Sequence, residues 1–191
     1  LEEEIAKDLQ KNDIHPREIT AIKNTQNRYE ISLTLNPCEG KDICTGIIVP
    51  TASLATGVAM CKSDGCCAYK EGKSKCSIRL VQKERLKIEC AAARQPKQGQ
   101  KVSGDNYGNM QIRGGKYIMT ISDGMGSGKQ AASQSNTAIE LLESFLDAGF
   151  EKSSAIKLIN SVLLLRSSDE TFATIDIVMV DLFSGIAEFI F

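Results

Sequence analysis

Residues 106–130 contain the pattern that most limits how this chain can fold. Two short apolar strands, 106–112 and 116–122, flank the turn Arg113-Gly114-Gly115, and the second strand runs into ISDGMGSGKQ. A helix is then expected over residues 127–146, because apolar side chains recur there at helical spacing. A hairpin that leads through a glycine loop into a helix predicts an α/β fold with an antiparallel sheet.

The glycine loop departs from both common phosphate-binding patterns. In G-x-x-x-x-G-K-[ST], counting back from Lys129, the first glycine would stand where the chain has Asp123, and Gln130 stands where a hydroxyl residue is needed. The pattern G-x-G-x-x-G fails as well, because the glycines fall at positions 124, 126 and 128. The sequence therefore gives no support for a nucleotide site.

The hairpin register suggests a different use for the loop. A turn centred on Gly114 places Asp105 opposite Asp123, with the two Cβ atoms about 5 Å apart. Two carboxylates at that spacing repel unless a cation lies between them, and oxygen ligands suit Mg²⁺ or Mn²⁺. Alternatively, both aspartates are simply turn-forming neighbours of Gly104 and Gly124. The residues alone leave these two interpretations open.

A change in composition near residue 83 predicts two modules, residues 1–82 and 83–191. In the second module we expect a strand over RLKIECAAA and a second helix, 154–165, capped by Ser153 or Ser154. FATIDIVMVDL and IAEFIF should form a hairpin over Ser184-Gly185.

The first module is predicted to be a small α/β unit. A helix in LEEEIAKDLQKN should end at His15 and Pro16, and a second helix is expected over 42–58. The expected strands are EITAIKN, YEISLTL, 58–62 and 76–82. Four of the seven cysteines are close enough in sequence to converge on a metal, with buried structural thiols as the alternative: Cys61, Cys66, Cys67 and Cys76.

Composition excludes several classes of function. The net charge of −1 and the absence of Trp argue against a nucleic-acid partner, and the basic excess in residues 73–101 is interpreted as a solvated strand face. The uncharged run Ile43 to Cys61 has too many small and polar residues to predict a membrane helix. His15 is the only histidine, which excludes Ser-His and Cys-His catalysis within this chain.

Four segments carry a resemblance to a known family: GDNYG, ISDGMGSG, SNTAIELLE and INSVLLLRSSDETFATIDIVMVDL. Together they resemble the stage II sporulation protein E family of endospore-forming bacteria, which ends in a metal-dependent serine/threonine phosphatase domain of type 2C. The resemblance is specific from about Leu86 to Phe191. Residues 1–82 look like the cytoplasmic region ahead of that domain. The implied fold class is α/β (α+β), with a small regulatory module before an incomplete αββα phosphatase sandwich.

The resemblance also implies a site. Asp105 matches the first metal-binding aspartate of the family and Asp123 the one that bridges two Mn²⁺ or Mg²⁺ ions, so both are catalytic candidates. Gly124 would offer its carbonyl oxygen as a third metal ligand. The later acidic motifs of the family do not occur in this sequence, so the domain looks cut short and the fragment is expected to be inactive alone.

By the same resemblance, the substrate is a phosphoserine on an anti-anti-sigma factor, whose dephosphorylation activates a compartment-specific sigma factor. The parent protein would lie at the cytoplasmic side of the membrane, with a cell-division ring protein as a further partner and a homodimer left open. The fragment itself is expected to be soluble. The alternatives are a stress-response phosphatase with a different sensor, or a non-catalytic interaction or metal-binding module.

Overall fold

The structure is a computed structural model that describes residues 1–38, 40–63, 71–96, 98–99, 101–166 and 173–191. The chain divides into two compact units, Leu1–Lys83 and Glu84–Phe191. In the described part of the chain, every helix is too short or too polar to cross a membrane.

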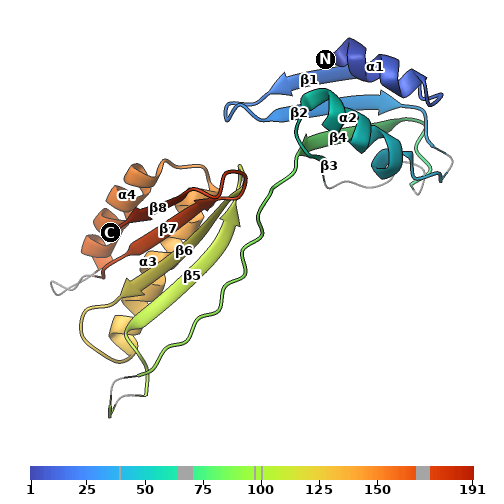
Figure 1. Ribbon diagram of the computed structural model, residues 1–191. Helices are drawn as coiled ribbons and strands as arrows, with labels where there is room; N and C mark the ends of the chain where they lie inside the picture. Colours follow the sequence, from blue (N-terminus) through green and yellow to red (C-terminus); the bar gives the residue numbers. More distant parts are fainter. Residues whose placement is uncertain (39, 64–70, 97, 100, 167–172) are drawn as a thin grey trace. The chain divides into compact units, whose positions relative to one another are not determined.

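The first unit is a four-stranded antiparallel sheet with helices on one face (Figure 1). The strand order is β1-β2-β4-β3. The strands are β1 (Glu18–Lys23), β2 (Tyr29–Leu35), β3 (Met60–Lys62) and β4 (Cys76–Gln82). The helices are α1 (Glu2–Gln10), the π-helical turn η1 (Cys44–Ile48) and α2 (Val49–Thr56). Each predicted strand and helix of this unit is present, but α1 ends at Gln10 rather than at His15 and Pro16.

Alternation along the strands builds the core of the first unit. In β2, Ile31 and Leu33 are buried on the side of the helices, whereas Ser32 between them is exposed. Ile5 and Leu9 of α1 are completely buried in the same cluster, as helical spacing requires for one apolar face. The opposite face of this sheet is therefore largely polar.

The helix expected over residues 42–58 begins as a π-helix. Asp42 caps its start, since its carboxylate accepts hydrogen bonds from the Thr45 hydroxyl (2.5 Å) and the Thr45 amide (3.4 Å). Pro50 is the second residue of α2, and it has no backbone N–H to donate to the π-helical turn before it. The change from π to α geometry therefore comes just ahead of the proline.

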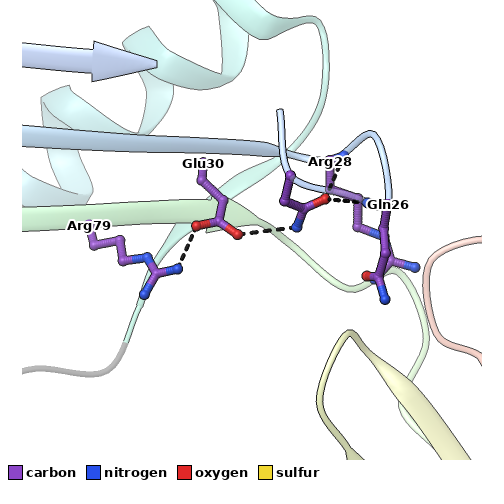
Figure 2. Close-up of polar contacts among 5 residues, drawn as sticks. Gln26, Arg28, Glu30 and Arg79 are labelled. Atoms are coloured by element: carbon purple, nitrogen blue, oxygen red, sulfur yellow. Dashed lines mark hydrogen bonds and ion pairs between the residues drawn. The ribbon is translucent and has the colours of Figure 1, made fainter. Parts of the chain in front are cut away.

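A chain of polar contacts fixes the end of the β1–β2 hairpin (Figure 2). Arg79 on β4 donates to the Glu30 carboxylate at 2.5 Å, and the Asn24 amide donates to the same carboxylate at 3.1 Å. The Asn24 side-chain oxygen accepts the backbone N–H groups of Gln26 (2.9 Å) and Arg28 (3.1 Å). The hydrogen bonds from Arg79 and Asn24 lower the pKa of Glu30, with the Arg79 hydrogen bond as the largest cause.

The second unit is also a four-stranded antiparallel sheet, with the strand order β5-β6-β7-β8. Its strands are β5 (Asp105–Ile112), β6 (Lys116–Asp123), β7 (Asp176–Asp181) and β8 (Ala187–Ile190). Two helices cover one face, α3 (Lys129–Asp147) and α4 (Lys152–Arg166) (Figure 1). Leu142 of α3 and Ile159 of α4 are fully buried against Ile118 and Ile177 of the sheet. The α/β fold class is confirmed.

The structure corrects two details of the second unit. RLKIECAAA is not a strand: the N–H groups of Arg85 and Leu86 both reach the Leu182 carbonyl (3.0 Å each), and no ladder forms along residues 85–93. Apolar alternation predicts which side of a strand is buried, but a strand also needs a partner. The cap of α4 is Glu151 rather than Ser153 or Ser154, because the Glu151 carboxylate accepts hydrogen bonds from the backbone N–H groups of both serines.

The face of this sheet opposite α3 and α4 carries apolar side chains. Ile121 and Phe189 are each 61% exposed, and Tyr107 is 48% exposed. These residues stand on β5, β6 and β8, and β7 lies between β6 and β8 in the sheet. The described residues thus provide one sheet and one helical layer of the predicted sandwich.

Candidate metal centre

The predicted hairpin register is confirmed. Asp105 pairs with Asp123 at the open end of the β5–β6 hairpin, and Ile112 pairs with Lys116 beside the turn. Gly114 and Gly115 supply the positive φ angles of that turn, 81° and 64°. The strand register therefore places the two aspartates opposite each other, although the whole hairpin separates them along the chain.

The two carboxyl groups interact directly. A hydrogen bond with the Asp105 carboxyl is the largest cause of a raised pKa at Asp123, followed by burial and the charge of Asp105. The Ser103 hydroxyl also donates to the Asp105 carboxylate, at 3.1 Å. Both aspartates are exposed at the end of the sheet, so a dissolved ion can reach them. Such a pair favours either a shared proton or a shared cation.

The loop after Asp123 is held tightly against α3. A Cβ atom on Gly124 would lie 2.0 Å from the Ala131 carbonyl oxygen, so only glycine fits beneath the first turn of the helix. The Gly124 N–H donates to the Gly104 carbonyl at 3.3 Å, and the Thr174 N–H donates to the Asp123 carbonyl at 3.0 Å. The third candidate ligand, the Gly124 carbonyl oxygen, lies close to Gly104.

A polar network behind the aspartates was not predicted from the sequence. The Asn106 amide donates to the Ala132 carbonyl (2.7 Å) and to the Ser135 hydroxyl (2.8 Å) on α3. Ser135 is completely buried, and its hydroxyl donates to the Gly104 carbonyl at 2.5 Å. On the other side, the Arg94 guanidinium donates to Asn106 Oδ1 (2.5 Å) and to the Asp105 carbonyl (3.2 Å).

The donor set fits a hard divalent cation, but it is small. Carboxylate and carbonyl oxygens are the ligands that Mg²⁺ and Mn²⁺ prefer, and Asp105, Asp123 and Gly124 provide only these. Across the described residues, no three His, Cys, Asp or Glu side chains gather in a group that could hold a metal ion. Water would therefore complete most of the coordination of an ion held here.

The cysteine hypothesis gains nothing from the described residues. Cys66 and Cys67 lie outside the described residues, so the structure does not test whether they bind a metal. Cys61 and Cys76 lie on the neighbouring strands β3 and β4 and are partly buried.

A family model described as stage II sporulation protein E matches residues 113–190. The chain is 33% identical to stage II sporulation protein E of Priestia megaterium, over 95% of this chain and 31% of that protein. It is also 33% identical to stage II sporulation protein E of Bacillus subtilis, over 99% of this chain and 23% of that protein. The chain thus spans less than a third of the length of these relatives.

One solved structure resembles both units at once. It contains the PP2C phosphatase domain and a fragment of the regulatory domain of the cell fate determinant SpoIIE from Bacillus subtilis. The match has a TM-score of 0.60 and 32% identity, and covers 98% of this chain and 54% of that one. The fold of the chain therefore matches that of a type 2C phosphatase domain.

Proposed function

Because the chain belongs to the stage II sporulation protein E family of sporulation phosphatases, we propose that it forms part of a metal-dependent protein serine/threonine phosphatase. The observation that carries this proposal is the pairing of Asp105 with Asp123 at one end of the sheet. A pair of exposed carboxylates close enough to share a hydrogen bond is suited to binding divalent cations.

In this proposal the two aspartates and Gly124 have distinct roles. Asp123 would supply the charge that a ligand shared by two Mn²⁺ or Mg²⁺ ions needs, Asp105 would hold one of the ions, and the Gly124 carbonyl would add a neutral oxygen. Bound ions would polarise a phosphoryl group and lower the pKa of a water molecule. Strand pairing and the contact of Gly124 with Ala131 hold the ligands in place, which limits the reorganisation needed when an ion binds.

The proposed substrate is a phosphoserine on an anti-anti-sigma factor, and its dephosphorylation would activate a compartment-specific sigma factor. The family relationship supports this substrate. On the same basis we propose that the parent protein acts at the cytoplasmic side of a membrane, with a cell-division ring protein as a further partner. The same proposal includes a homodimer of the parent protein.

We further propose that residues 1–191 alone do not turn over substrate. Two carboxylates and one carbonyl leave most of the roughly twelve coordination positions of two octahedral ions to water. An ion held so loosely is poorly placed to orient a nucleophile against a phosphoryl group.

The test uses phosphate release from a phosphoserine peptide in the presence of Mn²⁺. The full-length gene product should be active, residues 1–191 should be inactive, and Asp123→Asn in the full-length protein should remove activity. Asn keeps the size of the side chain and deletes the charge. Asp147→Asn, at the exposed C-terminal end of α3, is the matched control and should retain activity. Full activity of the Asp123→Asn variant would refute the assigned role.

Two alternative functions differ from this proposal in ways that experiments can test. A stress-response phosphatase of the same fold would share the metal centre and differ in its substrate, so assays with alternative phosphoproteins separate the two. A metal-binding or interaction module would depend on the cysteines, and metal analysis of residues 1–82 tests it directly.

A further inference from the structure

Arg94 lies outside both sheets yet contacts the end of β5 that carries the candidate metal ligands. Its Nη1 donates to the backbone carbonyl of Asp105 at 3.2 Å and to the Asn106 side-chain oxygen at 2.5 Å. Arg94 belongs to the extended segment before β5, which forms no strand along residues 85–93. A side chain from an irregular segment thus contacts the backbone of a candidate ligand.

The contact continues into α3 through two further side chains. Asn106 donates to the Ala132 carbonyl and to the Ser135 hydroxyl, at 2.7 and 2.8 Å. Ser135 in turn donates to the Gly104 carbonyl at 2.5 Å, directly ahead of Asp105. The residues on both sides of the Asp105 peptide groups are therefore bonded to the first two turns of α3.

The same helix turns define the second ligand position. Ala131 leaves no room for a side chain at Gly124, and the Gly124 N–H bonds to the Gly104 carbonyl at 3.3 Å. Gly104 thus receives a bond from Ser135 and another from the loop after Asp123. A shift of Asn106 relative to α3 would change the spacing between the two aspartates.

We propose that Arg94 is a positioning residue, which holds Asn106 and the Asp105 backbone so that Asp105 and Asp123 bind a divalent cation together. This inference rests on the proposed metal-dependent function. Arg94 touches neither carboxylate in these contacts and acts through Asn106, as outer-shell partners of metal ligands do.

The chemistry of the side chain explains why arginine suits this position. Both hydrogen bonds come from Nη1, and the planar guanidinium fixes the directions of the two N–H groups on this nitrogen, so a carbonyl and an amide oxygen are bound in a defined geometry. Lysine has a compact ammonium on a flexible stem and would orient Asn106 less strictly. Arg94→Lys should therefore weaken Mn²⁺ binding less than Arg94→Gln or Arg94→Ala.

The test measures Mn²⁺ affinity of residues 1–191 from the electron paramagnetic resonance signal of free Mn²⁺, so it does not depend on catalysis. Arg94→Gln should weaken Mn²⁺ binding about tenfold. Guanidinium ions added at millimolar concentration should restore binding to Arg94→Ala but not to Asp123→Asn. The double variant Arg94→Gln with Asn106→Ala should lose no more affinity than the weaker-binding single variant, because both substitutions break one chain of contacts.

Arg85→Gln is the matched control, since Arg85 lies in the same segment and bonds through its backbone N–H to the Leu182 carbonyl. It should leave Mn²⁺ affinity unchanged. Wild-type affinity in Arg94→Gln, together with weakened affinity in Asp123→Asn, would overturn the positioning role and keep the metal site. Wild-type affinity in Asp105→Asn and Asp123→Asn would overturn the metal site itself. Should Arg94→Gln fold poorly, partial binding by Arg94→Lys and the guanidinium rescue still decide the question.

Discussion

At the scale of single residues, the carboxylate pair could be predicted and the network behind it could not. The facing of Asp105 and Asp123 follows from a hairpin turn and from counting along two short strands, all of which is local sequence information. The contacts of Asn106 with Ala132 and Ser135 join positions 26 and 29 residues apart. They depend on how α3 packs on β5, which side-chain periodicity does not specify.

Glu30 provides a prediction about pH. Its lowered pKa means that the ionised carboxylate stabilises the folded state at pH values above the ordinary glutamate pKa, and that this stabilisation is lost as the pH falls through the lowered value. Glu30→Gln should reduce the free energy of unfolding at neutral pH by about 1 kcal/mol or less, because Arg79 is largely exposed. Urea unfolding should show that this difference disappears in acid.

The matched control for Glu30 is Glu89→Gln. Glu89 pairs with Lys87, and the two side chains are 82% and 84% exposed. A fully solvated pair contributes little to stability, so this substitution should leave the urea midpoint unchanged at both pH values. An equal loss of stability in the two variants would mean that the hairpin contacts of Glu30 stabilise the fold no more than an exposed ion pair does.

At the scale of elements, the helices and most strands follow from periodicity, and the exceptions have physical causes. The apolar spacing in α3 predicts a stripe of Ile139, Leu142, Phe145 and Leu146, of which Phe145 is only partly buried and the other three are buried, because an amphipathic face packs on the sheet. RLKIECAAA has strand-like alternation and yet forms no strand. The π-helical turn at Cys44 was also not predicted, since one inserted residue in a helix leaves little trace in the apolar pattern.

Gly108 tests how closely α3 lies on β5. A Cβ atom there would come within 2.5 Å of both the Ile139 side chain and the Glu143 carboxylate. Gly108→Ala should therefore push the helix outward and lower the free energy of unfolding by about 1–3 kcal/mol, as overpacking does. Replacing a strand glycine without such a neighbour should instead stabilise the fold by about 0.5–1 kcal/mol, so the sign of the change is diagnostic.

Differential scanning calorimetry of Gly108→Ala should show a lower transition temperature for the second unit. Gly46→Ala is the control, because Gly46 has no neighbouring atom within 4 Å of an added Cβ. Gly46→Ala should not lower the transition temperature of either unit. An unchanged or raised stability in Gly108→Ala would show that α3 has room to move at no cost.

At the scale of the whole molecule, the described residues form two separate buried clusters. One gathers Ile5, Leu33 and Leu80 in the first unit, and the other gathers Ile118, Leu142 and Ile177 in the second. The change in composition near residue 83 lies beside the structural boundary after Lys83. Each cluster is built from side chains of its own unit, which is the usual property of an independently folding domain.

We therefore expect residues 1–83 to fold alone. The isolated segment should show the far-ultraviolet circular dichroism of an α/β protein and a cooperative thermal transition. Its transition temperature should reappear among the transitions of the full chain. A segment that is unfolded on its own, while the full chain is folded, would contradict the independence of the first core.

The loop after Asp123 also bears on how this sequence can vary over evolutionary time. Gly124 and Gly126 look alike in the sequence, but they are constrained in different ways. Gly124 has no space for any side chain, since an added Cβ would overlap the Ala131 carbonyl. Gly126 has open space and a φ of +95°, which restricts the handedness of the backbone rather than the volume. Asparagine, which adopts left-handed conformations more readily than other side chains, is thus the replacement that position 126 tolerates best, whereas position 124 is closed to all nineteen alternatives among the standard amino acids.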